Sequence, residues 1–307
     1  MSIEQEILKI LGEHERDKIR QYLMAILKPE KIELVSDEDF KQFFIETHSV
    51  RTLAKILAAV CRLEEKMRII LTGPRGVGKT TTIRYVYNIL KKYVNVQLLE
   101  SLDKDINSSA SCFFILDSGW TSIEDVMKAL EKFPKNKSIC IELRPYLVLE
   151  GLERGLFEED NAWQIIVMTY PSEKDVREIV SRRFGKVSRV VQNPLLSLLL
   201  QIRSPEELGL DVVNMIKKLK GTKLRILWLL TIYDNGLFAK LISDIINKSP
   251  ATISRHLKEL EELGLIHGER VGKKMFYKLS SLPVIIKTEE TIVSEIIRKW
   301  GARVFTI

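Results

Sequence analysis

Cysteine, histidine and long apolar runs are all scarce in this sequence. Three cysteines and four histidines occur among 307 residues, and neither set has the spacing of a structural zinc site. Isolated thiols at Cys61, Cys112 and Cys140 indicate a reducing compartment, not a disulfide framework. No apolar run approaches the roughly 18 residues of a membrane span, and the first residues begin an acidic amphipathic pattern, not a basic leader. We therefore expect a cytoplasmic protein with no structural metal and no membrane partner.

An excess of charge of one sign is confined to the C-terminal part. The whole chain has a net charge of +7. Residues 220–307 contain 15 Lys and Arg against 9 Asp and Glu, a net of +6, whereas the remaining residues contain 33 against 32. This asymmetry favours a polyanionic partner for the C-terminal part, and a solvated charged surface is the alternative.

The most specific motif is a glycine-rich loop. Residues 73–80 read G-P-R-G-V-G-K-T and match the phosphate-binding pattern G-x-x-x-x-G-K-[ST], with an apolar run before it and a helical pattern after it. We expect backbone N–H groups to hold the phosphates of ATP, Lys79 to neutralise the outer phosphates, and Thr80 to ligate Mg²⁺. The expected nucleotide-binding residues are Gly73, Pro74, Arg75, Gly76, Val77, Gly78, Lys79, Thr80 and Thr81.

A second element of the expected nucleotide site is the run C-F-F-I-L-D, which ends in Asp117. An apolar strand ending in an acid is the form of a Walker B strand, so Asp117 and Thr80 are the expected metal residues, and Lys79 and Asp117 the expected catalytic pair. Position 118, where many related ATPases carry a catalytic Glu, is Ser118. Hydrolysis is therefore expected to be slow, or to use Glu100 or Glu142 as its base; both could equally be solvated acids at strand ends.

Three arginines are candidates for sensing the outermost phosphate. Arg144 follows the fourth strand-like run, and Arg182 and Arg183 lie on the helical segment after the core. A basic exposed helix face is the alternative for the last two.

Strand-like and helical runs alternate through the first half of the chain. The strand-like runs are 68–72, 94–99, 112–116, 138–143 and 164–169, and the helical runs after the glycine loop are 79–92, 122–133 and 147–157. This alternation predicts an α/β fold with a five-stranded parallel sheet, whose ligands bind beyond the carboxyl ends of the strands.

The chain is expected to divide into four parts. These are an ATPase core at 1–170, a helical lid at 171–220, a winged helix at 221–287, and a terminal helix for packing or dimerisation at 288–307. Within the first part, N-terminal helices are expected to about residue 27, at 37–44 and at 50–66.

Residues 224–280 divide into three helical runs and a basic hairpin, which is the layout of a winged helix-turn-helix. In such a domain the third helix enters the major groove of double-stranded DNA and the hairpin contacts its backbone. The expected DNA-binding residues are Thr252, Ser254, Arg255, Lys258, Lys273 and Lys274. Docking on another protein is the alternative use of a winged helix.

These motifs carry a family resemblance. The block T-I-S-R-H-L-K-E-L-E-E-L-G-L-I, followed by G-K-K-M-F-Y-K-L, resembles the recognition helix and wing of ArsR/MarR-type winged helices. Residues 50–184 are similar to AAA+ and STAND-type P-loop ATPases, and the order of ATPase, lid and winged helix resembles archaeal origin-recognition initiators. Ser118 and the short connection between the second and third strands depart from that pattern.

The resemblance implies a nucleotide-switched DNA-binding protein that uses ATP and Mg²⁺, in replication initiation or DNA-associated regulation, with self-assembly into a homo-oligomer as a further expectation. It implies that nucleotide sets the angle between core and lid and so places the winged helix. Two alternatives stay open: a transcription regulator that binds ATP without turnover, and an ATPase whose winged helix docks on a protein.

Overall fold

A parallel β-sheet forms the centre of the structure, a computed structural model that describes residues 47–62, 66–100, 106–107, 109–117, 119–157, 163–185, 187 and 189–307. The helices expected before residue 47, and Ser118, lie outside the described residues. Six strands pair in the order β2-β3-β4-β1-β5-β9, all parallel. The strands are β1 Arg68–Thr72, β2 Val96–Leu99, β3 Cys112–Ile115, β4 Ser138–Glu142, β5 Trp163–Val167 and β9 Val304–Thr306. The strand β4 therefore lies between β1, which leads into the glycine loop, and β3, which leads to Asp117.

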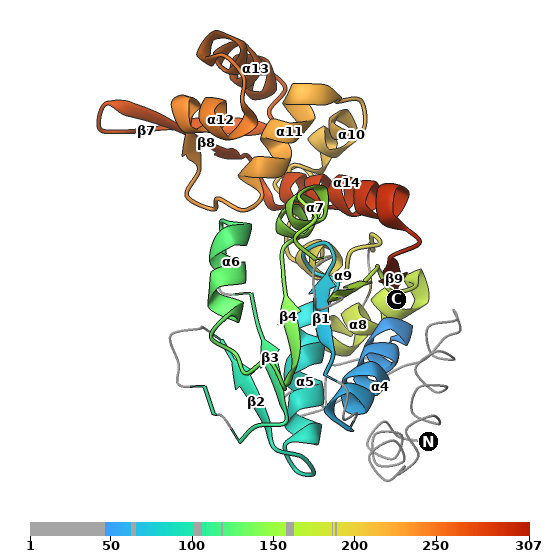
Figure 1. Ribbon diagram of the computed structural model, residues 1–307. Coiled ribbons are helices and arrows are strands. Elements are labelled where there is room, and N and C mark those ends of the chain that lie inside the picture. The colour runs from blue at the N-terminus through green and yellow to red at the C-terminus, as the bar shows by residue number, and fades with distance from the viewer. Residues whose placement is uncertain are drawn as a thin grey trace.

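Both faces of the sheet are covered by helices, as the buried apolar strands require (Figure 1). Successive residues of β1 point to opposite faces: Ile69 and Leu71 pack in one apolar cluster and Ile70 in the other. The first cluster is closed by α4 and α5, and the second by α6 and α7. These helices are α4 His48–Arg62, α5 Lys79–Leu90, α6 Ile123–Leu130 and α7 Pro145–Glu153.

The sheet has one strand more than predicted, and it comes from the far end of the chain. The expected five strands are joined by β9, which pairs with β5 through Ile165 and Val304. The terminal helix, α14 Leu282–Trp300, begins before the expected residue 288 and leads directly into β9. The segment 304–306 is too short for a strand pattern to be recognised, and only the exposed edge of β5 gives it a partner.

A small helical unit follows the core. It consists of α8 Glu173–Phe184, α9 Pro194–Leu199, the 3₁₀ helix Leu210–Val212 and α10 Val213–Ile216. The expected capping box at the start of α8 is present: the Ser172 hydroxyl accepts from the Asp175 amide, and Asp175 accepts from the Ser172 amide. Asn193 caps α9 by accepting from the Leu196 amide.

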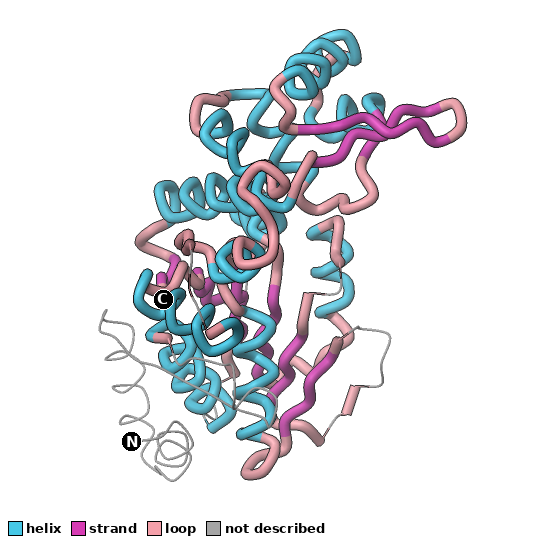
Figure 2. Tube along the Cα trace, turned by 180° about the vertical axis from the view of Figure 1, so that it is seen from behind, coloured by secondary structure: helices cyan, strands magenta, loops and turns pink. Residues whose placement is uncertain are grey.

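The C-terminal region has the expected winged-helix arrangement. Ser249 caps the third helix of this unit by accepting from the Thr252 amide, and that helix buries Ile253, Leu257 and Leu260. The hairpin projects away from the body of the protein (Figure 2). The elements are α11 Gly221–Leu230, α12 Ala239–Ile246, α13 Pro250–Glu262, and an antiparallel sheet of β6 Leu237–Phe238, β8 Lys274–Leu279 and β7 Ile266–Val271.

The winged helix and the α/β core share one apolar interior. Buried residues of α11 and α13 belong to the same cluster as those of α6 and α7. The helix α14 lies against α7, between the winged helix and the sheet (Figure 1). Its Ile292 and Ile296 are fully buried. These residues therefore pack within the chain, as expected of a packing helix, and dimerisation through the rest of the helix stays a prediction. Within the described residues, no helix is long and apolar enough to cross a membrane.

Candidate functional site

The glycine loop, residues 73–80, lies where β1 gives way to α5. Gly73 has φ 148°, and a Cβ there would stand 2.3 Å from the carbonyl oxygen of Met168. Gly76 has φ 84°, and its Cβ would stand 2.6 Å from Asn193 Oδ1. Any larger residue at either position would therefore push the loop away from β5 or from α9. The Lys79 ammonium, largely buried, donates to the carbonyl oxygens of Gly73, at 2.7 Å, and Pro74, at 3.1 Å.

A cavity of about 1030 Å³ opens beside this loop, at the carboxyl edge of the sheet. Its polar part is formed by the loop together with Asp117, Glu142, Arg144 and Glu289. Its apolar part is formed by α4, the helical unit after the core and nearby loops. The apolar part is lined by Val50, Pro171, Ile179, Phe184, Pro194, Leu195 and Leu198. Of the loop residues expected to bind nucleotide, all except Pro74 line the cavity.

Thr80 and Glu142 face each other across the polar part. The Thr80 hydroxyl lies 2.8 and 2.9 Å from the two carboxylate oxygens of Glu142, to which it donates. Burial raises the pKa of the Glu142 carboxyl above its usual value, and the Lys79 charge and the Thr80 hydrogen bond partly offset that effect. Glu100, the other candidate base, instead forms a surface ion pair with Arg84 at 2.9 Å and does not line the cavity. Of the two candidate bases, the structure therefore brings only Glu142 to the site.

Asp117 is held at the same edge by two donors. Its carboxylate accepts from the Gly119 amide at 2.9 Å and from Arg144 Nε at 2.8 Å. Burial alone would lower the pKa of Arg144, but Asp117 and Asp234 raise it above the ordinary value. Arg144 is thus the predicted sensor arginine that reaches the cavity.

The other two predicted sensor arginines lie elsewhere on α8. Arg182 is ion-paired with Glu178 at 2.6 Å and does not line the cavity. The side chain of Arg183 lies outside the described residues.

The groups at this edge fit a nucleotide with its metal ion. Oxygen atoms, such as those of Thr80 and Asp117, are the ligands that Mg²⁺ prefers. The loop offers backbone N–H groups at the start of α5, and Lys79 supplies a buried cation for a phosphate. The apolar part of the cavity suits a flat aromatic base.

Sequence reasoning missed Glu289, a carboxylate of α14 that reaches into the site. Its side chain is only 1% exposed, and it accepts from the Arg75 backbone amide at 2.6 Å and from Arg75 Nε at 2.8 Å. Burial raises its pKa, and the charges of Arg75 and Lys79 partly offset the rise. The signal was available: Glu289 occupies a position on the apolar stripe that includes Ile292 and Ile296, where an acid needs a specific partner.

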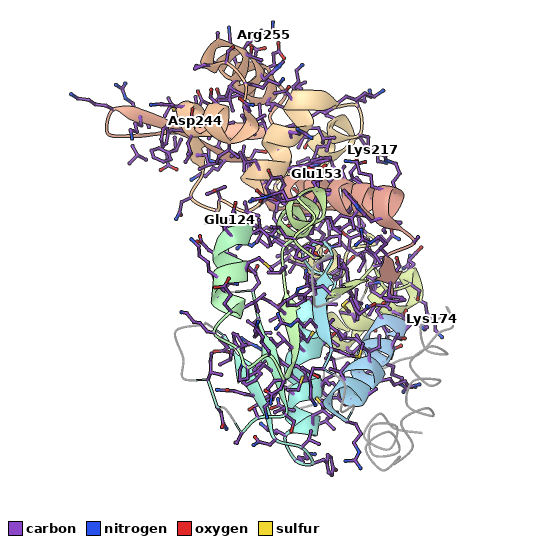
Figure 3. The ribbon with its side chains drawn as sticks, viewed as in Figure 1. Glu124, Glu153, Lys174, Lys217, Asp244 and Arg255 are labelled. Carbon is purple, nitrogen blue, oxygen red and sulfur yellow. The ribbon has the colours of Figure 1, made fainter. Side chains whose placement is uncertain are left out.

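The predicted DNA-binding residues lie on the outer side of α13 and at the tip of the hairpin. Arg255 is exposed at the end of the molecule opposite the sheet (Figure 3). Of the six residues, Thr252 is half-buried and bonded to the capping Ser249, whereas Ser254, Arg255, Lys258, Lys273 and Lys274 are exposed. Lys274 lies over the ring of Phe238 at 4.4 Å, which holds one cation of the hairpin in place.

Comparisons with known proteins match the C-terminal unit most specifically. The family described as "Helix-turn-helix domain" matches residues 221–269, which confirms the helix-turn-helix predicted there. A search of the curated proteins found no match.

Several solved structures are similar at low identity. A winged helix-turn-helix domain from Mycobacterium bovis, a possible ArsR-family transcriptional regulator, is 22% identical with a TM-score of 0.26 and covers 32% of this chain and 92% of its own. The RuvB Holliday junction branch migration motor of Thermotoga maritima is 15% identical with a TM-score of 0.31 and covers 85% and 91%. The Drosophila ORC, bound to AT-rich DNA and Cdc6, is 11% identical with a TM-score of 0.22 and covers 91% and 96%.

Proposed function

We propose that this protein binds MgATP in the cavity beside the glycine loop and double-stranded DNA through its winged helix, as a nucleotide-switched DNA-binding protein in replication initiation or DNA-associated regulation. One observation carries the proposal. The loop residues 73–80, Asp117 and Glu142 converge on one cavity at the carboxyl edge of a parallel sheet, where ligands of such sheets bind.

In this proposal the apolar and polar ends of the cavity bind different parts of the nucleotide. The apolar walls formed by Val50, Ile179 and Phe184 take the base, and the loop amides with Lys79 take the phosphates. Bound Mg²⁺ would neutralise phosphate charge and orient the phosphates. Thr80 and Asp117 supply oxygen ligands for it, directly or through water.

Slow hydrolysis is part of the same proposal, with Glu142 as the general base. It is the buried carboxylate beside Thr80, and the burial that raises its pKa makes it a better proton acceptor than an exposed acid. Glu142 would thereby supply the function that Ser118 cannot. Self-association stays a prediction.

The winged helix supports DNA binding by its exposed cations. Arg255 and Lys258 on α13 and Lys273 at the hairpin tip are all exposed and can meet phosphates or base edges. Because these residues lie far from the cavity, we expect DNA binding to persist when the nucleotide site is damaged.

The test of the nucleotide site is Lys79→Ala. Loss of a charge-assisted hydrogen bond is worth about 1.5–3 kcal/mol, so MgATP affinity should fall by about 10- to 100-fold, measured by isothermal titration calorimetry. Binding to a duplex oligonucleotide should remain measurable. Lys174→Ala, which removes an exposed cation on α8, is the matched control. An MgATP affinity equal to that of the wild type in Lys79→Ala would refute the site.

A further inference from the structure

The winged-helix unit and α14 contact the proposed nucleotide site through two arginines. Arg75 belongs to the glycine loop itself, and Arg144 follows β4. The Thr231 carbonyl oxygen, at the end of α11, accepts from Arg75 Nη2 at 2.8 Å and from Arg144 Nη1 at 3.3 Å. The turn after α11 adds a carboxylate: Asp234 Oδ1 lies 3.2 Å from Arg75 Nη2, and its Oδ2 lies 3.1 Å from Arg144 Nη2.

Both arginines therefore form ion pairs with carboxylates of the C-terminal part. Burial would raise the pKa of Asp234, but the charges of Arg144 and Arg75 outweigh it and lower that pKa. Arg144 also holds Asp117 on its other side. We call this set of contacts among Arg75, Arg144, Asp234 and Glu289 the arginine latch.

The carboxylate of Glu289 lies where a phosphate-binding loop would otherwise hold the negative charge of a phosphate. Its carboxylate lines the same cavity as Lys79 and accepts a hydrogen bond from the Arg75 backbone amide within the loop. A nucleotide phosphate entering this cavity meets a buried carboxylate that competes for the same donors and repels it. Bound phosphate and the intact latch are thus unfavourable together.

We propose that the arginine latch and a nucleoside triphosphate compete, so that triphosphate binding withdraws Arg75 and Arg144 from Glu289 and Asp234 and loosens the winged helix on the core. This rests on the proposed function and specifies how the site is regulated. Coupling between two events is reciprocal. The factor by which triphosphate binding destabilises the latch therefore equals the factor by which the closed latch weakens triphosphate binding, so removing the latch strengthens that binding. The diphosphate, with one phosphate fewer, competes less.

The movement is bounded by the fold. The winged helix is connected to the core on both sides, through α10 before it and through α14 and β9 after it, and β9 is paired with β5. The recognition helix α13 faces away from the core while the latch is closed (Figure 3). Nucleotide therefore changes how the winged helix is held on the core, and so where its DNA-binding face is placed, without covering that face.

The first test measures nucleotide affinity in the full chain. Glu289→Gln and Asp234→Asn keep the shape of each side chain and remove its charge. Each should tighten binding of a non-hydrolysable MgATP analogue by about fivefold or more, within the usual range of coupling between sites, with a smaller effect on MgADP. Glu295→Gln is the matched control, because Glu295 also lies on α14 but pairs with Arg298 and Lys299 away from the cavity.

The second test measures the latch itself by amide hydrogen exchange over residues 231–236. The MgATP analogue should accelerate exchange there in the wild type, MgADP less so, and Asp234→Asn should accelerate it without nucleotide. Asp234 is 57% exposed, so we expect this substitution to disturb the fold less than Glu289→Gln, and the test stands even if Glu289→Gln does not fold.

Two outcomes separate this inference from the function on which it rests. If the wild type binds no nucleotide, the proposed function fails and the competition fails with it. If the wild type binds nucleotide but both variants bind it equally well or more weakly, the two acids only brace the loop and the inference alone is overturned. Unchanged exchange at 231–236 on saturation with the analogue also overturns it.

Discussion

At the scale of single residues, the unusual groups are buried carboxylates that the fold places beside cations. Glu142 meets Thr80 and Lys79, and Glu289 meets Arg75. Leaving a buried charge unpaired is costly, so each of these acids constrains the loop it contacts. Nothing in the local sequence distinguishes Glu142 from Glu100, since both simply end a strand-like run. The arrangement of the strands separates them, because β4 lies beside β1 whereas β2 lies at the edge of the sheet.

A prediction at this scale concerns Glu142→Gln. Glutamine still accepts a hydrogen bond from the Thr80 hydroxyl but cannot take a proton, so ATP turnover should fall by about 100-fold or more while MgATP still binds. Phosphate release in single-turnover experiments measures the effect. Turnover equal to that of the wild type would show that the base is another group.

The pH dependence of turnover gives a second prediction for the same residue. As the proposed base, Glu142 would act only when deprotonated, so turnover should decrease as the pH falls through its pKa. Because burial raises that pKa in the protein without nucleotide or metal, the acid limb of the pH profile of kcat/KM, which reports the free enzyme, should lie above that of an ordinary carboxyl. The profile of the wild type between about pH 4 and 8 measures it. An acid limb no higher than that of an ordinary carboxyl contradicts the assignment.

At the scale of elements, α13 and the β7–β8 hairpin are where local sequence and structure agree best. Ser249 and Pro250 define the start of α13, and its apolar stripe of Ile253, Leu257 and Leu260 orients the exposed residues outward. The ion pairs of Arg255 with Glu259, at 3.8 Å, and of Lys258 with Glu262, at 3.7 Å, join exposed side chains and are weak. Both cations can exchange these partners for DNA phosphates at little cost.

The prediction for these elements is a change in salt dependence. Arg255→Ala and Lys273→Ala should each weaken duplex binding, and a variant that no longer neutralises one phosphate should show a slope of log K against log salt that is shallower by about 0.9. Fluorescence anisotropy at several salt concentrations measures both quantities. Lys174→Ala, on the side of the core, should leave the slope unchanged (Figure 3). If all three variants behave alike, the winged helix serves protein docking instead.

At the scale of the whole molecule, the segment after the winged helix adds a last strand to the parallel sheet of the core. This strand is β9, and Val304 and Ile307 are buried against the core. The family resemblance implied that nucleotide acts on the winged helix through the angle between the core and the lid. In the structure the first helix of the winged-helix unit, with the turn that follows it, also contacts the site directly, through Thr231 and Asp234.

The corresponding prediction is that β9 stabilises the core. Val304→Ala removes two buried carbon groups, a loss of about 1.6 kcal/mol at about 0.8 kcal/mol each. The Tm should therefore fall by a few degrees in differential scanning calorimetry. Thr306→Ala, at an exposed position of the same strand, should change it little. Equal Tm values for Val304→Ala and the wild type would contradict the role of β9.

The sequence by itself determined the elements whose signal is local. The glycine loop is recognisable because Gly73, Gly76 and Gly78 allow backbone conformations that other residues avoid, and the caps and apolar stripe of α13 act within a single helix. Tertiary structure alone decided which distant groups meet: β9 on β5, Glu142 at Thr80, and Glu289 and Asp234 on Arg75. Such contacts join residues up to 214 positions apart. Their energy depends on burial and pairing in the folded chain, which no local pattern of residues encodes.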